Sequence, residues 1–395
     1  MSEGQPRARV PLAPQPDGPI GISIERDFSR LAARAAEWNA LLQRSPTNTV
    51  FQTFEFHASW WKVFGGDGNH ALVLLAECDG ELVGIAPLMT REHSFLGRRQ
   101  RIVQFIGARS FDYCDFIVDG ERPEVLPLLL ARLAQPDCAF DLLHLRDIPG
   151  TSPSVAAVQA FFDARRFFTD SRMLYEAPTR LFNDPAADRQ LPNKKSLRRH
   201  HNYFQRSGKL EFRDCRSGDE IVPYLERFFE QHVRRRAVTD TPSLFLDERM
   251  RGFFRELACV LAPQGWLLFT VVLYDDKPIA MHFGFEYAKR IIWYKPAFEM
   301  EHAKHSPGEV LIRHLLQYAL EREVEELDFT IGEEPFKYRF ANHTRSNHAV
   351  RVYRRRVSRG IACLILDARR WVERRPALTR AARRALRRWR DQPWL

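Results

Sequence analysis

Some segments of the chain show the two-residue hydrophobic period of β-strands and others the 3.6-residue period of α-helices. This predicts a mixed α/β protein. Strand-like runs of β-branched and aromatic residues are expected at 71–77, 81–90, 140–145, 267–274, 277–286, 290–296 and 326–331. Apolar residues that recur at intervals of three and four residues predict helices over 28–43, 53–64, 123–134, 193–207, 218–235, 247–261 and 307–321. Ser306 is the expected N-cap of the last of these helices, and Pro307 its first residue.

One pattern occurs twice, which predicts two similar halves. Residues 72–84 lie over residues 268–280 when the sequence is displaced by 196 positions, so the turn at Asp79-Gly80 falls on the turn at Asp275-Asp276. Each hairpin is followed later by a helix and then a strand. We therefore expect a leader at 1–21, a first domain at 22–178, a second at 179–356, and a tail at 357–395, with a closing strand at 350–355.

The charge is concentrated at one end of the chain. Residues 351–395 contain 15 arginines against three acids, a net charge of +12, whereas the whole chain carries only +10. The apolar stripes of this tail lie opposite arginine faces, which favours an anionic membrane surface as the partner of residues 360–395. An RNA backbone and a solvated tail packed on the second domain are the alternatives.

The order hairpin, strand, helix, strand resembles the core of the GNAT acyltransferase superfamily, and more closely its Fem-type and exopolysaccharide-cluster branch. The resemblance covers roughly residues 48–345. The motifs that carry it are Phe51-Gln-Thr-Phe-Glu-Phe-His-Ala-Ser-Trp-Trp61, Lys195-Ser-Leu-Arg-Arg199 with Gly208, Ser306-Pro-Gly308, and Asp328-Phe with Gly332-Glu333 and Phe336-Lys337. It implies two tandem GNAT-like domains, each a mixed sheet flanked by helices, with the chemistry in the second.

The catalytic candidates lie around the last two strands of the second half. Lys337 is expected to stabilise an oxyanion or a donor phosphate, beside an activated carbonyl delivered into a cleft between the halves. The alternative is a lysine paired with Glu333 or Glu334. Asp328, in an otherwise apolar strand, is either a general base or a structural partner. His282 and Tyr294 are further acid–base candidates, against the simpler interpretation that both belong to the core.

Substrate-binding candidates fall into two groups. Trp293, Ser306, Gly308 and Glu309 are the expected donor-binding residues. His57, Trp60, Arg198 and Arg199 are the expected acceptor-binding residues, although a packed aromatic helix explains the first two and a solvated helix face the last two. No spacing of histidines or cysteines predicts a metal site.

The resemblance implies transfer of an acyl group from a thioester such as acyl-CoA to an amine of a cell-envelope glycan, lipid or related metabolite. The start of the helix at 307 departs from the pattern of acetyl-CoA enzymes, because Pro307 removes an N–H group and Glu309 adds a negative charge. Aminoacyl-tRNA and an acyl carrier protein therefore stay open as donors, with tRNA not favoured. A catalytically silent partner in polysaccharide assembly is the alternative outside the enzymes. The scattered cysteines and the absence of an 18-residue apolar run predict a cytoplasmic protein, peripheral on the membrane through its tail.

Overall fold

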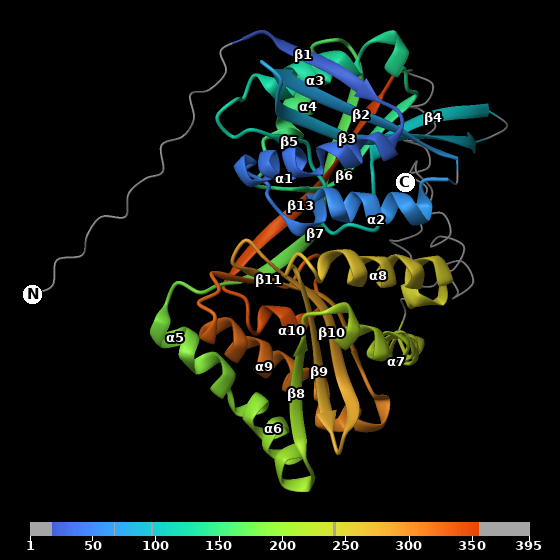
Figure 1. Ribbon diagram of the computed structural model, residues 1–395. Coiled ribbons are helices and arrows are strands. Elements are labelled where there is room, and N and C mark those ends of the chain that lie inside the picture. Colours follow the sequence, from blue (N-terminus) through green and yellow to red (C-terminus); the bar gives the residue numbers. More distant parts are fainter. Residues whose placement is uncertain (1–17, 67, 96–97, 240–241, 355–395) are drawn as a thin grey trace, which may run out of the picture.

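The computed structural model describes residues 18–66, 68–95, 98–239 and 242–354 (Figure 1). The first half contains strands β1 (Ile20–Glu25), β2 (Asn69–Cys78), β3 (Glu81–Phe95), β4 (Arg98–Phe105), β5 (Ile117–Val118), β6 (Leu142–Pro149) and β7 (Phe168–Leu181). Its helices are η1 (Phe28–Arg34), α1 (Ala35–Arg44), η2 (Val50–Gln52), α2 (Phe54–Phe64), α3 (Val125–Leu133), η3 (Pro136–Cys138) and α4 (Ser154–Asp163).

The second half also combines strands and helices. Its strands are β8 (Leu210–Cys215), β9 (Leu267–Tyr274), β10 (Lys277–Tyr287), β11 (Arg290–Phe298), β12 (Glu326–Asp328) and β13 (His343–Tyr353). Its helices are α5 (Pro185–Gln190), η4 (Leu191–Asn193), α6 (Lys195–Ser207), α7 (Gly218–Ala237), η5 (Leu244–Leu246), α8 (Glu248–Leu261), η6 (Met300–His305), α9 (Pro307–Glu321) and α10 (Pro335–Tyr338). The predicted mixed α/β class is confirmed.

The internal repeat extends to an irregularity of the hairpins. Cys78 pairs with Glu81 across the first turn, and Tyr274 pairs with Lys277 across the second, 196 positions later. The registers of both hairpins shift just beyond the turn, so that Val83 in β3 and Ile279 in β10 are the extra residues. These two positions are again 196 apart. Bulges at equivalent places are what the predicted repeat would produce.

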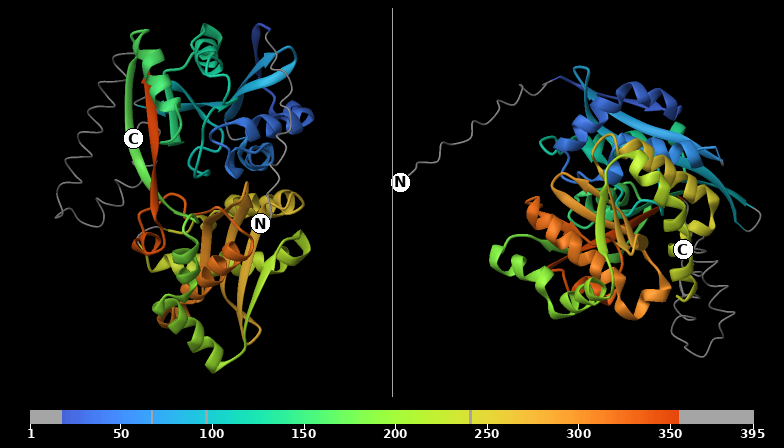
Figure 2. Two further views of the ribbon diagram at one scale, coloured as in Figure 1. Left: turned by 90° about the vertical axis from the view of Figure 1, so that its left-hand side faces the viewer. Right: turned by 60° about the horizontal axis from the view of Figure 1, so that its bottom comes forward.

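The two halves exchange their last strands, which joins them into one sheet. The strand order is β1-β2-β3-β4-β6-β13-β7-β12-β11-β10-β9-β8, with β5 attached to β3. Strand β7, which ends the first half, pairs with β12, and β13, which ends the second half, pairs with β6. The long β7–β13 pair crosses from one half to the other (Figures 1 and 2). The predicted closing strand therefore exists, but it starts earlier and completes the sheet of the first half.

Aromatic packing fills the junction between the halves. The ring of Phe51, from η2, lies with its centroid 5.8 Å from that of Phe285 in β10 and 5.3 Å from that of Tyr294 in β11. Phe56 in α2 contacts Phe253 in α8 at 5.8 Å. A second core lies on the other face of the second half, where α6 and α9 cover β9 to β12. The aromatic contacts make the junction part of the main hydrophobic core rather than a hinge.

Candidate active site

A splay between two parallel strands marks the centre of the second half. β11 pairs with β12 over only three residues, Arg290–Ile292 against Glu326–Asp328. Just beyond, Trp293 and Tyr294 of β11 lie opposite the single residue Gly284 of β10, which is a β-bulge. A bulge bends the strand that contains it. The bend therefore turns β11 at the point where its pairing with β12 ends, and beyond it the Thr330 hydroxyl donates to the Trp293 carbonyl at 3.3 Å. The predicted gap between these strands stays a prediction.

The first half has no bulge at the equivalent place. β4 and β6 also pair in parallel over three residues, Ile102–Gln104 against Leu142–His144, but the β3–β4 register continues without a shift. The position equivalent to Asp328 is His144, a buried residue. Burial, together with Arg351 and other nearby arginines, holds the pKa of His144 well below its usual value. The bulge and the carboxylate beside it are therefore features of the second half alone among these two equivalent strand pairs.

Asp328 stands at the apex of the splay. Its carboxylate accepts hydrogen bonds from the Tyr113 hydroxyl at 3.0 and 2.9 Å and from the Thr330 backbone N–H at 2.7 Å. Burial raises the pKa of Asp328 to about 6, and the neighbouring carboxylate of Glu326 adds to the rise. Such a carboxyl is ionised at neutral pH and can accept a proton from a substrate.

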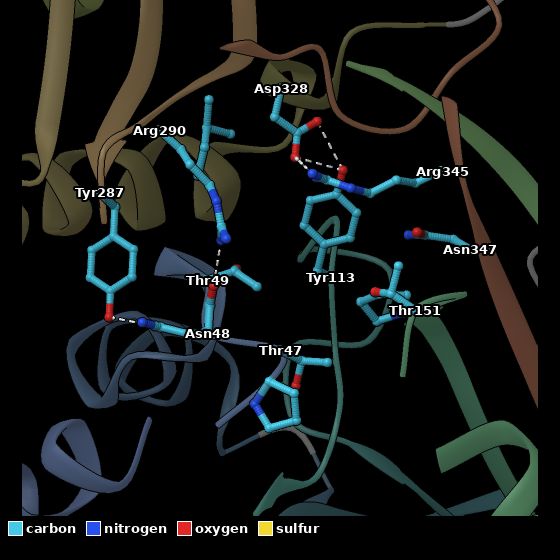
Figure 3. A pocket seen from close by; sticks show the side chains of 13 residues that line it. Thr47, Asn48, Thr49, Tyr113, Thr151, Tyr287, Arg290, Asp328, Arg345 and Asn347 are labelled. Atoms are coloured by element: carbon cyan, nitrogen blue, oxygen red, sulfur yellow. Dashed lines mark hydrogen bonds and ion pairs between the residues drawn. The ribbon is translucent and has the colours of Figure 1, made fainter. Parts of the chain in front are cut away.

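Asp328 lines a cavity of about 270 Å³ between the halves, which we call the acceptor pocket. Side chains enter it from the segment after α1, from the loop containing Tyr113, and from β11, β12 and β13 (Figure 3). The lining consists of Pro46, Thr47, Asn48, Thr49, Tyr113, Pro149, Thr151, Tyr287, Arg290, Ile292, Asp328, Arg345 and Asn347. Both halves therefore contribute to one pocket.

The arginines of the acceptor pocket are occupied by protein groups. Arg345 forms two hydrogen bonds of 2.6 Å to Glu326, in a bidentate pair, and its guanidinium lies 3.8 Å from Asp328. Arg290 donates to the backbone carbonyl of Asn48 at 2.9 Å. Because Glu326 neutralises Arg345, the pocket does not present a strong positive field to an anion.

Asn347 supplies an unsatisfied acceptor to the same pocket. Its side-chain Nδ2 donates to the carbonyl of Asp112 at 2.7 Å, which fixes the orientation of the amide. Its Oδ1 is buried without a hydrogen-bond partner in the described part of the chain. A buried carbonyl oxygen without a donor is unfavourable by about 1–3 kcal/mol. A ligand that brings an N–H or O–H group removes this cost.

Lys337 is not placed as predicted. Its side chain is 5% exposed. The ammonium lies 2.9 Å from Glu334, 2.8 Å from the carbonyl of Ile331 and 3.5 Å from that of Thr330. An ammonium has three donors, and these three acceptors use them. The expectation of a carbonyl delivered beside Lys337 is therefore wrong, and the alternative pairing with Glu334 is observed.

The two acid–base candidates, His282 and Tyr294, belong to the core, which was the alternative interpretation. His282 is fully buried, stacks on Trp293 with ring centroids 4.7 Å apart, and accepts from the Tyr294 backbone N–H at 3.2 Å. Burial lowers the pKa of His282 to about 3. The Tyr294 hydroxyl donates to the Ser110 carbonyl at 2.8 Å. His282 and Trp293 instead hold the bulge, and Tyr294 ties it to the first half.

The start of α9 differs from the expected N-cap. Ser306 adopts a left-handed conformation (φ 49°, ψ 62°) and its side chain forms no capping hydrogen bond, whereas Pro307 begins the helix as predicted. Glu309 pairs with Arg339 at 2.6 Å. A Cβ on Gly308 would make only an ordinary contact with Phe298, at 3.6 Å. Ser306, Gly308 and Glu309 thus lie together at one end of α9.

The predicted acceptor residues do not line the acceptor pocket. His57 is 2% exposed between Trp38 and Phe111, and burial lowers its pKa to about 4. The Trp60 indole donates to Ser110 at 3.1 Å. Arg198 and Arg199 lie exposed on α6, the helix that packs beside α9. Aromatic spacing in α2 thus reflects core packing.

Sequence reasoning missed most of the pocket. Tyr113, Arg345 and Asn347 occupy a loop and a strand without a recognisable motif. They lie near Asp328 only because β7 and β13 exchange between the halves. Local sequence periodicity does not predict this exchange. Within the described residues, no group of three histidines, cysteines or acids could hold a metal ion.

Comparison with known proteins identifies the second half. Residues 193–338 match the model of the acetyltransferase (GNAT) domain family. This segment of the second half is a GNAT domain. The match spans α6 to α10 and includes the splay, the bulge and Asp328. A search of curated proteins returned no match.

The fold of the whole chain is also found among solved structures. FemX superposes with a TM-score of 0.57 at 12% identity, covering 80% of this chain and 95% of FemX. A conserved protein of unknown function from Bacteroides thetaiotaomicron has a TM-score of 0.53 at 13% identity, covering 85% of this chain and all of that one. At these identities the likeness concerns the fold, and it confirms the predicted Fem-type resemblance at that level.

No helix among the described residues is long and apolar enough to cross a membrane. The predicted leader and the arginine-rich tail lie outside the described residues, apart from the last few residues of the leader.

Proposed function

We propose that this chain is an N-acyltransferase that moves an acyl group from a thioester donor, such as acyl-CoA, to an amine of a cell-envelope glycan, a lipid or a related metabolite. The donor enters the splay between β11 and the chain after β12 from the side of Gly308. The amine enters the acceptor pocket. The observation that carries this proposal is Asp328, an ionisable carboxylate where the splay and the pocket meet.

The chemistry follows from the groups at this meeting point. The amine nitrogen attacks the donor carbonyl, its proton passes to the Asp328 carboxylate, and the tetrahedral intermediate expels the thiolate. Asn347 Oδ1 accepts a second N–H of the amine and orients its lone pair. Tyr113 acts as a positioning residue, because its hydroxyl donates to both oxygens of Asp328.

Asp328→Asn tests the role of the base. The substitution keeps the shape of the side chain and removes its basicity, so kcat should fall by about 10²–10⁴-fold while the free energy of unfolding changes little. Turnover is measured with acetyl-CoA and a panel of amino sugars and aminoalkanes, by release of free thiol. Arg322→Gln, a substitution on the outer end of α9, is the control. A variant as active as the parent chain removes Asp328 from the mechanism, and a catalytically silent protein would show no turnover at all.

A second donor, aminoacyl-tRNA, is favoured by one observation. Helix α6 exposes Lys195, Arg198, Arg199 and Arg206 and contains no acidic residue, beside the end of α9 where the donor would lie. Phosphates of a nucleic acid bind such a face, and binding then weakens steeply with salt. Equilibrium binding of acetyl-CoA and of a charged tRNA, each with the parent chain and with Arg198→Gln/Arg199→Gln, distinguishes the donors. Tight, salt-sensitive binding of tRNA alone would replace acyl-CoA in the proposal.

The tail suggests where the protein works. We infer that residues 360–395 contact anionic lipid on the cytoplasmic face of a membrane, as their arginine faces and apolar stripes predict. Deletion of these residues should abolish salt-sensitive pelleting with vesicles that contain phosphatidylglycerol. Unchanged pelleting would assign the contact to another surface.

A further inference from the structure

A second cavity, of about 190 Å³, adjoins the acceptor pocket in the first half. We call it the arm pocket. Pro46 and Thr47 line both cavities, one on each side of them. Pro46 is exposed, so both cavities open beside it. The remaining lining is Ser45, Asp115, Phe116, Val118, Asp119, Gly120, Pro123, Leu126, Pro127, Ser152, Pro153, Ser154 and Ala157.

The two carboxylates in this lining are satisfied by the protein. Asp115 is held by the Phe116 backbone N–H at 2.8 Å and by hydroxyls of Thr47, Ser152 and Ser154. Asp119 accepts from Arg44 at 2.7 Å and from the Glu121 backbone N–H at 3.1 Å. Carboxylates whose oxygens are already occupied leave little for a polar ligand to gain.

The surface that remains is apolar. Phe116, Val118 and Leu126 form one side, and four prolines and Ala157 complete the walls. Ser45 adds one hydroxyl, whose Oγ is buried without a partner in the described part of the chain. It precedes Pro46, where the two cavities adjoin. The arm pocket therefore offers mainly apolar walls.

We propose that the acceptor is an amphipathic amine: its amine-bearing polar part lies in the acceptor pocket, and an apolar arm crosses Pro46 into the arm pocket. This inference rests on the proposed function for the position of the amine. At ~30 Å³ per small group, the cavity has room for on the order of six methylene groups.

Two probes that differ only in the arm test the inference without a donor. Octyl and methyl 2-amino-2-deoxy-β-glucoside carry the same amine, and their Kd values for the full-length chain are measured by calorimetry below the micellar concentration. We expect octyl to bind at least about tenfold more tightly, because burial of each methylene favours binding. Equal affinities of the two probes for the parent chain would overturn the proposal.

Neighbouring alanines on α4 provide the matched variants. Ala157 lines the arm pocket, whereas Ala156 is exposed on the same helix. Ala157→Phe should remove most of the octyl advantage and leave methyl binding unchanged, and Ala156→Phe should leave both unchanged. An octyl advantage that survives Ala157→Phe would place the arm elsewhere and reject the arm pocket.

Failure of the proposed function gives a different result. If the chain does not use Asp328 as a base, Asp328→Asn leaves turnover unchanged while the octyl advantage and its loss in Ala157→Phe persist. If only the arm pocket is wrong, Asp328→Asn still lowers kcat, and either the two probes bind equally or the octyl advantage survives Ala157→Phe.

Discussion

Asp328 is a carboxyl group whose protonation is controlled by its surroundings. Burial and the nearby Glu326 favour the neutral acid, while Tyr113, Arg345 and the Thr330 N–H favour the carboxylate. The balance leaves the pKa at about 6, above the ordinary value of 3.8. A base with this pKa is ionised at neutral pH yet more basic than an exposed aspartate, which suits transfer of a proton from an amine.

The pH dependence of catalysis should report this group. We expect kcat/KM to rise as the pH increases through about 6, because only the carboxylate accepts the proton. The residual activity of Asp328→Asn should not show this rise of kcat/KM with pH. The raised pKa also means that Asp328 contributes stability below pH 4 that is lost as the pH rises through about 6, so the variant should lose less stability over this interval. A parent profile flat between pH 5 and 7 would contradict the assignment.

Lys337 has a structural role at the same site. Its ammonium joins Glu334 to the carbonyls of Thr330 and Ile331 and so fixes the chain that leaves β12. Lys337→Met should reduce the free energy of unfolding by roughly 2–4 kcal/mol, because a carboxylate and two carbonyls lose their partner. Denaturant titration measures this. Lys277→Met, at an exposed position of β10, should change stability by less than about 0.5 kcal/mol. A stable Lys337→Met variant that has lost only turnover would restore the catalytic interpretation.

At the scale of elements, the bulge in β11 gives the second half its splay. Trp293 and Tyr294 occupy the space of one residue, and Gly284 faces them from β10. The lack of a side chain at Gly284 permits this, because a Cβ there would lie 2.6 Å from His282 Nε2 and 2.7 Å from the Ile292 carbonyl. The second of these is backbone and cannot move without disturbing the strand.

Gly284→Ala should therefore damage both stability and turnover. We expect a loss of about 1–3 kcal/mol in the free energy of unfolding, as for other overpacked core sites, together with a higher KM for the donor. Gly252→Ala, in the interior of α8 with open space around it, should instead stabilise the protein by about 0.5–1 kcal/mol. Thermal melts and donor kinetics separate the two. If Gly284→Ala matched Gly252→Ala in both, the bulge would not depend on glycine.

At the scale of the molecule, the exchange of β7 and β13 removes the boundary that two tandem domains would have. The predicted division at 178–179 falls inside β7, which pairs with strands of the second half. The acceptor pocket depends on this arrangement, because Arg345 and Asn347 of β13 reach it from the strand that completes the first half.

Unfolding should consequently be a single transition. Amides of the β2–β3 hairpin and of the β9–β10 hairpin are expected to lose protection at the same denaturant concentration, since neither sheet is complete without a strand of the other half. Hydrogen exchange with mass spectrometry resolves the two hairpins. Separate midpoints would show that the halves fold independently despite the exchange.

The sequence by itself determined the local elements and the repeat. Hydrophobic period, turn residues and Pro307 specify hairpins and helices through contacts between near neighbours. The repeat at 196 residues was visible because both hairpins have a similar pattern of apolar and turn residues. It also marked Asp328 as a candidate site residue, because an acid in an apolar strand is unfavourable unless it is paired or lies at a cleft. Only the tertiary structure decided that Lys337 is fully occupied, that His57 and His282 are core residues, and that β7 and β13 exchange. Those outcomes depend on contacts between residues far apart in the chain, which local periodicity does not encode.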